Sequence, residues 1–282
     1  MKSIMTVDVE DWFHILDIPS APRLSAWDSL PSRIVHNFRT LLDIFEENKI
    51  RVTCFFLGWI AERHKDIVKE ASRCGHETAS HGYRHCLVYE MGPEEFLRDA
   101  SDSKKLLEDI TGTAVLGYRS AGFSTTEKTP WFFDKLIEAG YTYDSSVFPA
   151  ARQHGGMRSA AFAPYVVARH PTPFVEFPIS VATVLGMRLC FFGGGYLRLF
   201  PYPIVRIMAR GVLGENRPVI FYVHPREIDP DHPRMNMSIV RRFKSYVNLR
   251  TTEPKLRRIA RDFELTTFQG YLRENPELME ME

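Results

Sequence analysis

The chain alternates short apolar runs of strand length with longer amphipathic runs of helical length, and this pattern restricts its fold more than any other feature. Apolar, β-branched runs favour strands, and apolar residues that recur every three or four positions favour helices. Strands are expected at 4–9, 50–57, 77–79, 115–118, 141–144, 218–223 and 265–268. Helices are expected at 31–45, 59–73, 93–111, 130–140, 203–213, 238–249 and 253–262. The alternation predicts an α/β fold with parallel strands, either an open sheet or a barrel.

The length of the chain sets the expected domain organisation. Its 282 residues fit one large α/β unit. No internal repeat, low-complexity tract or linker interrupts the sequence. We therefore expect one domain over 1–282, with an irregular loop region at about 150–200, where glycine and proline are frequent, and a helical C-terminal part.

Charge and cysteine content restrict the partners and the compartment. With 36 basic and 35 acidic residues the formal charge is +1, which gives no support for nucleic-acid binding. Basic runs at 241–244 and 255–258 lie at helical spacing among apolar residues and indicate solvated helix faces. No apolar run reaches the roughly 18 residues of a membrane span. The four cysteines form no Cys-x-x-Cys pair, and no secretory signal precedes the first strand, so a cytoplasmic protein with free thiols is expected. A homo-oligomer is compatible with the sequence, which leaves the oligomeric state open.

Polar residues follow most of the expected strands. In parallel α/β folds, catalytic groups gather at the carboxyl ends of the strands. The residues in such positions are Asp8, Glu10, Asp11, His81, His85, Arg119, Asp144 and His224. We therefore treat these residues as the candidates for chemistry.

His81 and His85 are four positions apart, in the segment after the strand at 77–79. Two histidines at this spacing can reach one metal ion from a single helical turn. The spacing alone is weak evidence, because coincidence or local packing also produces it. The segment has no apolar face on which the two histidines would simply pack, and this favours a metal site.

Asp8, Glu10 and Asp11 close the first strand. Carboxylates this close repel one another unless a cation or solvent relieves them, so they form either an exposed strand end or part of a metal site. In a metal site, one carboxylate joins the two histidines as third ligand and leaves an open position for water. A second carboxylate near that water can take its proton.

His224 and Arg119 each allow two interpretations. His224 ends an expected strand, where it is either a general acid, because histidine titrates near neutral pH, or a hydrogen-bond partner of a neighbouring loop. Arg119 either pairs with a surplus carboxylate and keeps it ionised, or is a surface arginine.

These segments, in this order, resemble the five motifs of the polysaccharide deacetylases of carbohydrate esterase family 4, also called the NodB homology domain. The matching segments are TVDVED at 6–11, HGYRH at 81–85, RSAG at 119–122, YDSS at 143–146 and YVHP at 222–225. The resemblance extends from about residue 3 to 268. The first motif continues into Trp12 and Phe13, as in a bacterial branch of the family that is associated with exopolysaccharide systems.

The resemblance implies a fold, a reaction and residue roles. The implied fold is a single-domain distorted (β/α) barrel of about seven parallel strands. The implied reaction is metal-dependent removal of N-acetyl groups from amino sugars of a polysaccharide or its precursor, with release of acetate. The cofactor would be one divalent metal ion, Zn²⁺ before Co²⁺, Ni²⁺ or Mn²⁺. The roles carried over are general base for Asp8, metal ligands for His81 and His85, general acid for His224, partner of the base for Arg119, and orientation of His224 or shaping of the pocket for Asp144.

The sequence departs from the family pattern in two places. An Asp-Val-Glu-Asp segment replaces the family's adjacent aspartates, so Glu10 and Asp11 are both candidates for the third metal ligand. Strand alternation places Asp8 and Glu10 on one side and favours Glu10, whereas Asp11 takes the role if the strand ends before it. The family's motif proline is absent after Arg119, which leaves the shape of that loop open.

Three aromatic residues near these motifs are candidates for sugar binding. Trp12, Tyr196 and Tyr222 can stack on the apolar face of a pyranose, and ordinary core packing is the alternative for each. An N-acetylated saccharide is thus the expected partner. Two further functions stay open: an amidohydrolase of the same architecture that acts on another C–N amide bond, and a non-catalytic sugar-binding relative.

Overall fold

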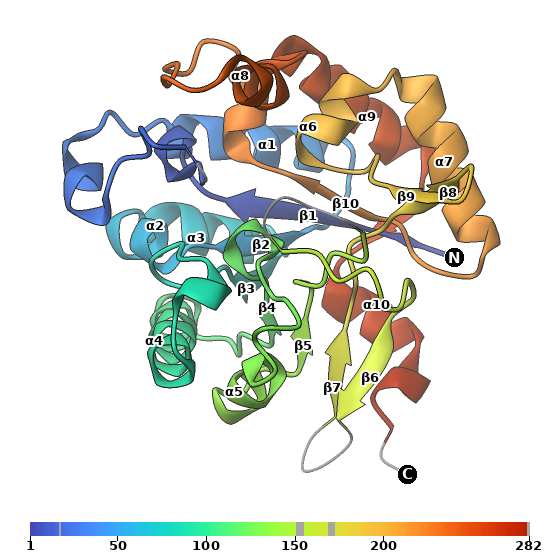
Figure 1. Ribbon diagram of the computed structural model, residues 1–282, viewed down its shortest axis with the longest axis horizontal. Coiled ribbons are helices and arrows are strands. Elements are labelled where there is room, and N and C mark those ends of the chain that lie inside the picture. The colour runs from blue at the N-terminus through green and yellow to red at the C-terminus, as the bar shows by residue number, and fades with distance from the viewer. Residues whose placement is uncertain (17, 151–154, 169–172, 281–282) are drawn as a thin grey trace.

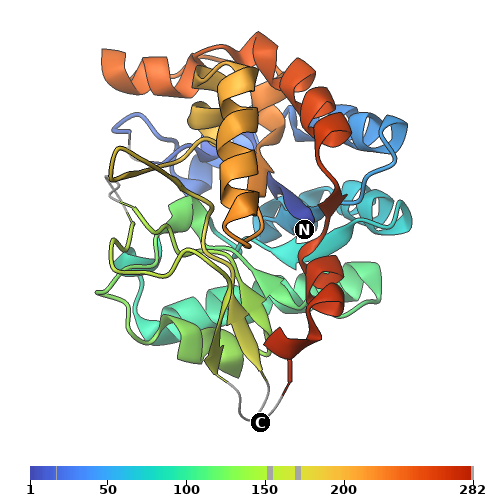
Figure 2. The same cartoon turned by 90° about the vertical axis from the view of Figure 1, so that its right-hand side faces the viewer.

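A computed structural model describes residues 1–16, 18–150, 155–168 and 173–280, and its framework is a curled β-sheet flanked by helices (Figures 1 and 2). The strands are β1 (Ser3–Val9), β2 (Thr53–Phe56), β3 (Glu77–Ser80), β4 (Gly117–Tyr118), β5 (Tyr143–Asp144), β6 (Tyr165–Ala168), β7 (Phe174–Glu176), β8 (Ala182–Val184), β9 (Met187–Leu189), β10 (Ile220–Val223) and β11 (Leu265–Thr266). Seven of them run parallel in the order β10-β1-β2-β3-β4-β5-β7. At the margins β6 pairs antiparallel with β7, β11 pairs with β1, and β8 and β9 form a separate hairpin.

The helices cover this sheet in two groups. They are α1 (Ile34–Glu47), α2 (Gly58–Arg63), α3 (Lys65–Arg73), α4 (Pro93–Thr111), α5 (Phe132–Glu138), α6 (Gly194–Leu199), α7 (Tyr202–Gly214), α8 (Ile239–Tyr246), α9 (Thr252–Asp262) and α10 (Phe268–Glu274). Helices α1 to α5 follow one another along the sheet, and α6 to α9 gather at the top of Figure 1. Within the described residues, no helix combines the length and the apolar character that crossing a bilayer requires.

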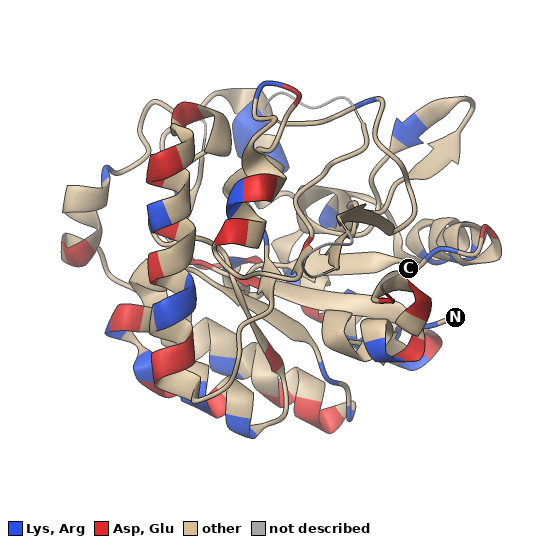
Figure 3. Cartoon of the chain, turned by 90° about the horizontal axis from the view of Figure 1, so that it is seen from below, with Lys and Arg blue, Asp and Glu red and all other residues tan. Residues whose placement is uncertain are grey.

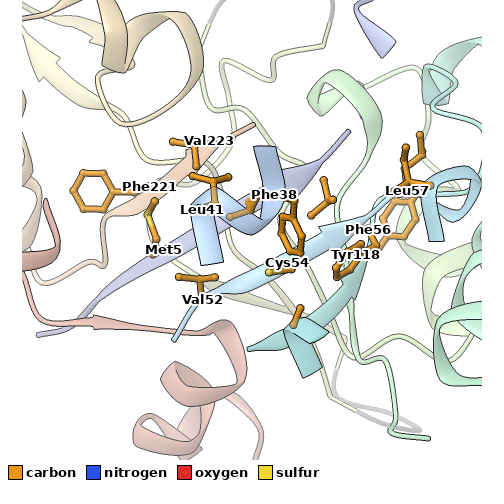
Figure 4. Packing of buried hydrophobic residues seen from close by; sticks show 14 of the residues in the cluster. Met5, Phe38, Leu41, Val52, Cys54, Phe56, Leu57, Tyr118, Phe221 and Val223 are labelled. Atoms are coloured by element: carbon orange, nitrogen blue, oxygen red, sulfur yellow. The ribbon is translucent and has the colours of Figure 1, made fainter. Parts of the chain in front are cut away.

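The core explains why the first strand is buried along its whole length. Every residue of β1 is buried, as expected for a central strand of a parallel sheet that is covered on both faces. On one face, Phe38 and Leu41 of α1 pack over Cys54 and Phe56 of β2 (Figure 4). On the other face, Phe55 packs against Phe268 of α10, because successive side chains of a strand point in opposite directions.

The structure confirms the predicted fold class, with parallel strands in a curled sheet. Several elements have other limits than expected, and two of the differences change the course of the chain. The helix expected at 59–73 is interrupted at His64, whose backbone leaves the helical region between α2 and α3. The strand expected at 265–268 ends at Thr266, and α10 follows it. The expectation of one domain over 1–282 stays a prediction, although residues from both halves of the chain form the same sheet.

The strand registers bring the carboxyl ends together. Phe56 of β2 lies in register with Val9 and Ser80, and Tyr118 of β4 lies in register with Ser80 and Asp144. The segments that follow these strands therefore meet at one edge of the sheet, where parallel α/β folds place their chemistry.

Candidate active site

The loop after β3 presents two buried histidines. His81 Nδ1 lies 2.8 Å from the Arg119 carbonyl oxygen, and because that oxygen can only accept, the ring donates from Nδ1 and its Nε2 lone pair is left for a ligand. The Asp99 carboxylate of α4 holds the loop by accepting from the backbone N–H groups of Tyr83 and Arg84. This anchoring turns His85 back toward His81, with ring centroids 5.2 Å apart.

Glu10 completes a set of three metal-ligating groups. One ligand atom each from Glu10, His81 and His85 lies within 4.8 Å of the others, and all three residues are buried. Glu10 Oε2 lies 2.6 Å from His85 Nε2. Burial opposes ionisation of Glu10, but His85 and His224 outweigh it and hold its pKa far below the usual range. Two imidazoles and one carboxylate are a ligand set that catalytic zinc sites use.

Two further observations fit a cation at this position. Glu10 Oε2 is buried and accepts no hydrogen bond of good geometry from the described residues, although His85 Nε2 lies 2.6 Å away. Burial lowers the pKa of His81 to about 4, so its imidazole is neutral near pH 7, as a metal ligand must be. The residues present therefore fit a divalent ion.

Asp11 points away from this set. Its carboxylate accepts from the backbone N–H groups of Trp12 and Arg33 and from the Ser32 hydroxyl, at 2.8, 3.0 and 2.6 Å respectively. It thereby caps the short 3₁₀ turn Trp12–His14. Of the two candidates for third ligand, the structure places Glu10 with the histidines and Asp11 outside the group.

Asp8 and Arg119 form a buried ion pair beside the three ligating groups. Arg119 Nη1 donates to Asp8 Oδ1 at 2.7 Å and to the Thr6 hydroxyl at 2.7 Å. Nε and Nη2 of the same guanidinium donate to the backbone carbonyl and the hydroxyl of Ser145. Arg119 is thus a fully buried residue that fixes Oδ1 of Asp8. The other carboxylate oxygen, Oδ2, faces His224 and lies 3.8 Å from its Nε2.

His224 faces both carboxylates of the first strand. Its Nε2 lies 3.4 Å from Glu10 Oε1, and its Nδ1 lies 3.2 Å from Glu227 Oε1. Burial works against the charged ring, but Glu10, Glu227 and Asp8 outweigh it and raise the pKa of His224. Glu227 is itself buried, with Arg198 Nε at 3.7 Å.

Asp144 was expected either to orient His224 or to shape the pocket. It does not lie beside His224, and it does not line the cavity described below. Its carboxylate accepts from the hydroxyl and the backbone N–H of Ser146, at 2.6 and 2.9 Å. It lies opposite Glu176 in the β5–β7 pair, and burial raises the pKa of Asp144 to about 6. The residue that contacts His224 Nδ1 is Glu227.

A cavity of about 540 Å³ opens over these groups. Asp8, Glu10, the three histidines His81, His85 and His224, and the predicted Tyr196 and Tyr222 all line it. Trp12 is a core residue instead: its ring is buried in the main hydrophobic cluster, and its indole N–H donates to the Pro31 carbonyl at 3.0 Å.

Sequence reasoning missed two residues of the site. His14 lines the cavity, and its Nδ1 accepts the Asp11 backbone N–H at 2.9 Å, so the proton of the neutral ring sits on Nε2. Burial, followed by the nearby His85, keeps the pKa of His14 well below its ordinary value. The spacing from Asp11 to His14, typical of a capping box, was the available signal. For Glu227 the signal was its position three residues after His224.

Comparison with known proteins relates this chain to the polysaccharide deacetylases. Residues 24–143 match the family described as polysaccharide deacetylase, and residues 145–273 match a domain of unknown function, DUF3473. The match to residues 24–143 agrees with the resemblance of the motifs to the polysaccharide deacetylases.

Two curated relatives agree with this assignment. A peptidoglycan deacetylase of Helicobacter pylori is 28% identical over 107 residues, which are 38% of this chain and 36% of that protein. A peptidoglycan-N-acetylglucosamine deacetylase of Bacillus cereus is 28% identical over 101 residues, which are 36% of this chain and 46% of that protein. The matched region thus spans less than half the length of either relative.

Solved structures show the same fold. A structure described as a polysaccharide deacetylase from Mycobacterium smegmatis has a TM-score of 0.63 and 17% identity, and the alignment covers 99% of this chain and 93% of that one. The Puue allantoinase has a TM-score of 0.59 and 16% identity, with 97% and 90% covered. A family 4 carbohydrate esterase from Streptomyces lividans, in complex with acetate, has a TM-score of 0.51 and 11% identity, with 94% and 91% covered.

Proposed function

We propose that this protein is a metal-dependent N-deacetylase that releases acetate from the amino sugars of a polysaccharide or its precursor. The observation that carries the proposal is the cluster of Glu10, His81 and His85 directly beside the Asp8–Arg119 pair and His224. The two peptidoglycan deacetylases among the relatives support an N-acetyl amino sugar as the substrate class.

Glu10, His81 and His85 would hold the cation. A bound divalent ion, Zn²⁺ before Co²⁺, Ni²⁺ or Mn²⁺, supplies Lewis-acid polarisation of the amide carbonyl and lowers the pKa of the attacking water. Asp8 is placed to take the proton of that water through Oδ2, because Arg119 occupies Oδ1. Arg119 also holds Asp8 in one orientation.

His224 is placed to return a proton. Water adds to the acetyl carbonyl, the C–N bond breaks, and the sugar amine leaves with a proton from His224 Nε2. Because Glu227 accepts from Nδ1, the ring keeps Nε2 directed into the cavity. The raised pKa of His224 favours the protonated ring that a general acid needs. The products are acetate and a free amine.

The space around the site suits an extended saccharide. A second cavity, of about 670 Å³, shares His14, Ile15, Leu16 and His85 with the first. The second cavity therefore borders the first next to the candidate ligand His85 and offers room for further sugar residues. Tyr196, at the mouth, offers an aromatic face for a pyranose.

The test is an acetate-release assay on N-acetylglucosamine oligomers, with and without a chelator. We expect turnover that the chelator abolishes and a divalent ion restores. Asp8→Asn should lower kcat by about 100- to 10,000-fold, the usual contribution of a general base. Asp102→Asn, the same chemical change on the exposed side of α4, should leave kcat unchanged.

Two outcomes would contradict the proposal. Hydrolysis of small cyclic ureides in place of acetate release would assign the site to the other amidohydrolase class. Full activity of Asp8→Asn would remove Asp8 as the base.

A further inference from the structure

Helix α8 exposes its large apolar side chains. Ile239, Val240 and Phe243 are 87%, 65% and 56% exposed, whereas the residue that α8 buries is the small, polar Ser245. Helices on the surface of a globular protein normally turn the apolar side inward. The reversed orientation of α8 indicates that its outer face meets something other than water.

The exposed apolar residues form one stripe with cations on both sides. At about 100° per residue, Ile239, Val240 and Phe243 fall within an arc of about 100°. On the same helical projection, Arg242 flanks the arc on one side and Lys244 on the other. Both cations are exposed. An apolar stripe between basic residues is the arrangement of helices that lie in a lipid–water interface.

The charge of the whole segment has one sign. Between 232 and 252 the chain has no Asp or Glu, and its cations are Arg234, Arg241, Arg242, Lys244 and Arg250. By contrast, acidic and basic residues alternate on the helices seen from below (Figure 3). A basic segment of this kind complements an anionic surface such as that of an anionic bilayer.

The helix is held firmly on the protein. The buried guanidinium of Arg198, from α6, donates to the carbonyls of Lys244, Ser245 and Val247 at the C-terminal end of α8. At the other end, Arg241 donates to the Leu16 carbonyl. The apolar stripe is therefore presented in a defined orientation.

This stripe borders the mouth of the candidate active site. Val240, Phe243 and Lys244 line the same cavity as Glu10 and His224. We propose that α8 docks the protein on an anionic lipid bilayer and so brings the mouth of the cavity to the membrane surface. The enzyme then acts on saccharide presented at that surface.

Vesicle co-sedimentation tests the docking directly. We expect binding to phosphatidylcholine vesicles that contain about a third phosphatidylglycerol, weak binding to pure phosphatidylcholine, and weaker binding as salt screens the cations. Ile239→Ser should lower the partition coefficient about tenfold, because it removes an inserting side chain. Arg242→Ser should lower it about fivefold. Neither residue lines the cavity, so acetate release from soluble oligomers should be unchanged.

Matched controls separate α8 from general effects. Leu185→Ser removes an apolar side chain that is 94% exposed on the β8–β9 hairpin, and Arg98→Ser removes an exposed cation from α4; both should bind vesicles as the wild type does. Asp8→Asn should also bind normally, so docking and catalysis can fail independently. Equal binding of Ile239→Ser and wild type, or no dependence on phosphatidylglycerol, would refute the proposal. So would a wild-type dimer that Ile239→Ser converts to a monomer, since the face would then cover a second copy of the chain.

Discussion

Glu10 and Asp11 are adjacent carboxylates with different surroundings. Glu10 is buried against His85 and His224, where the cationic forms of these rings lower its pKa. Asp11 is surrounded by hydrogen-bond donors of the backbone and Ser32. The same functional group thus serves a candidate metal site at one position and a helix cap at the next.

Substitution of each carboxylate should therefore affect a different property. Glu10→Gln should weaken metal binding by at least about tenfold and leave folding intact. Asp11→Ala should keep metal binding and lower the free energy of unfolding by about 1 kcal/mol, the usual cost of losing a cap. Isothermal titration with Zn²⁺ and urea unfolding measure the two effects. The reverse result would assign the third ligand to Asp11.

Glu227 acts through His224. Removal of its negative charge should lower the pKa of His224, because Glu227 is one of the groups that raise it. The general acid must be protonated, so Glu227→Gln should move the alkaline limb of the kcat–pH profile to lower pH. We expect kcat to fall about tenfold at pH 7, with little change in KM. A parallel loss of kcat at every pH would indicate a purely structural role, and Glu277→Gln, an exposed carboxylate, serves as control.

At the scale of elements, β5 and β7 place two buried carboxyl groups side by side. Asp144 and Glu176 are in register and fully buried. Burial, reinforced by Asp144, raises the pKa of Glu176 well above its ordinary value, and burial raises that of Asp144 to about 6. Both carboxyl groups therefore hold their protons more tightly in the folded chain than in the unfolded chain.

This pair makes stability depend on pH in a defined direction. A carboxyl group whose pKa is raised by folding binds its proton more tightly in the folded chain, so stability is lost as pH rises from about 4 through about 6. Glu176→Gln keeps the oxygen that accepts from Val147 N–H and removes one charge. We expect this variant to flatten the pH dependence of urea unfolding and to be more stable than the wild type at pH 8. An unchanged slope, equal to that of the exposed control Asp134→Asn, would contradict this.

Elements with strong periodicity were predictable from the sequence, and their exact limits were not. Strand β1 and helix α4 were predictable because the apolar spacing of each fits one kind of element. In α4, Pro93 at the start and Gly112 at the end also mark the limits of the helix. The break at His64 was missed because the apolar spacing continues through this residue. Helix α10 was missed because Thr266 and Thr267 are β-branched and favour a strand, whereas in the structure the Thr267 side chain caps the helix.

At the scale of the whole molecule, the site draws on separate parts of the chain. Asp8 and Glu10 precede the region that matches the deacetylase family, His81 lies inside it, and His224 and Glu227 lie in the second matched region. The parallel sheet joins them, because its strands end at one edge. The whole of this site therefore requires strands from both matched regions.

This arrangement also explains which site residues could be predicted. Asp8 lies near the carboxyl end of β1, and Glu10, His81, Arg119 and His224 directly follow strands, so the topology alone brings these residues together. Partners that depend on side-chain direction could not be found this way. The packing of Trp12 into the core arises from tertiary structure that no local spacing encodes. The three-residue spacing of His224 and Glu227 does not by itself direct the two side chains toward each other.

The central claim is that one divalent cation is bound by Glu10, His81 and His85. Metal analysis of the purified protein by inductively coupled plasma mass spectrometry tests it most directly, on the wild type, His81→Ala and Asp8→Asn. The account predicts one divalent ion per chain in the wild type and in Asp8→Asn, and loss of the ion in His81→Ala. Equal metal content in the wild type and His81→Ala, in folded protein, would contradict it.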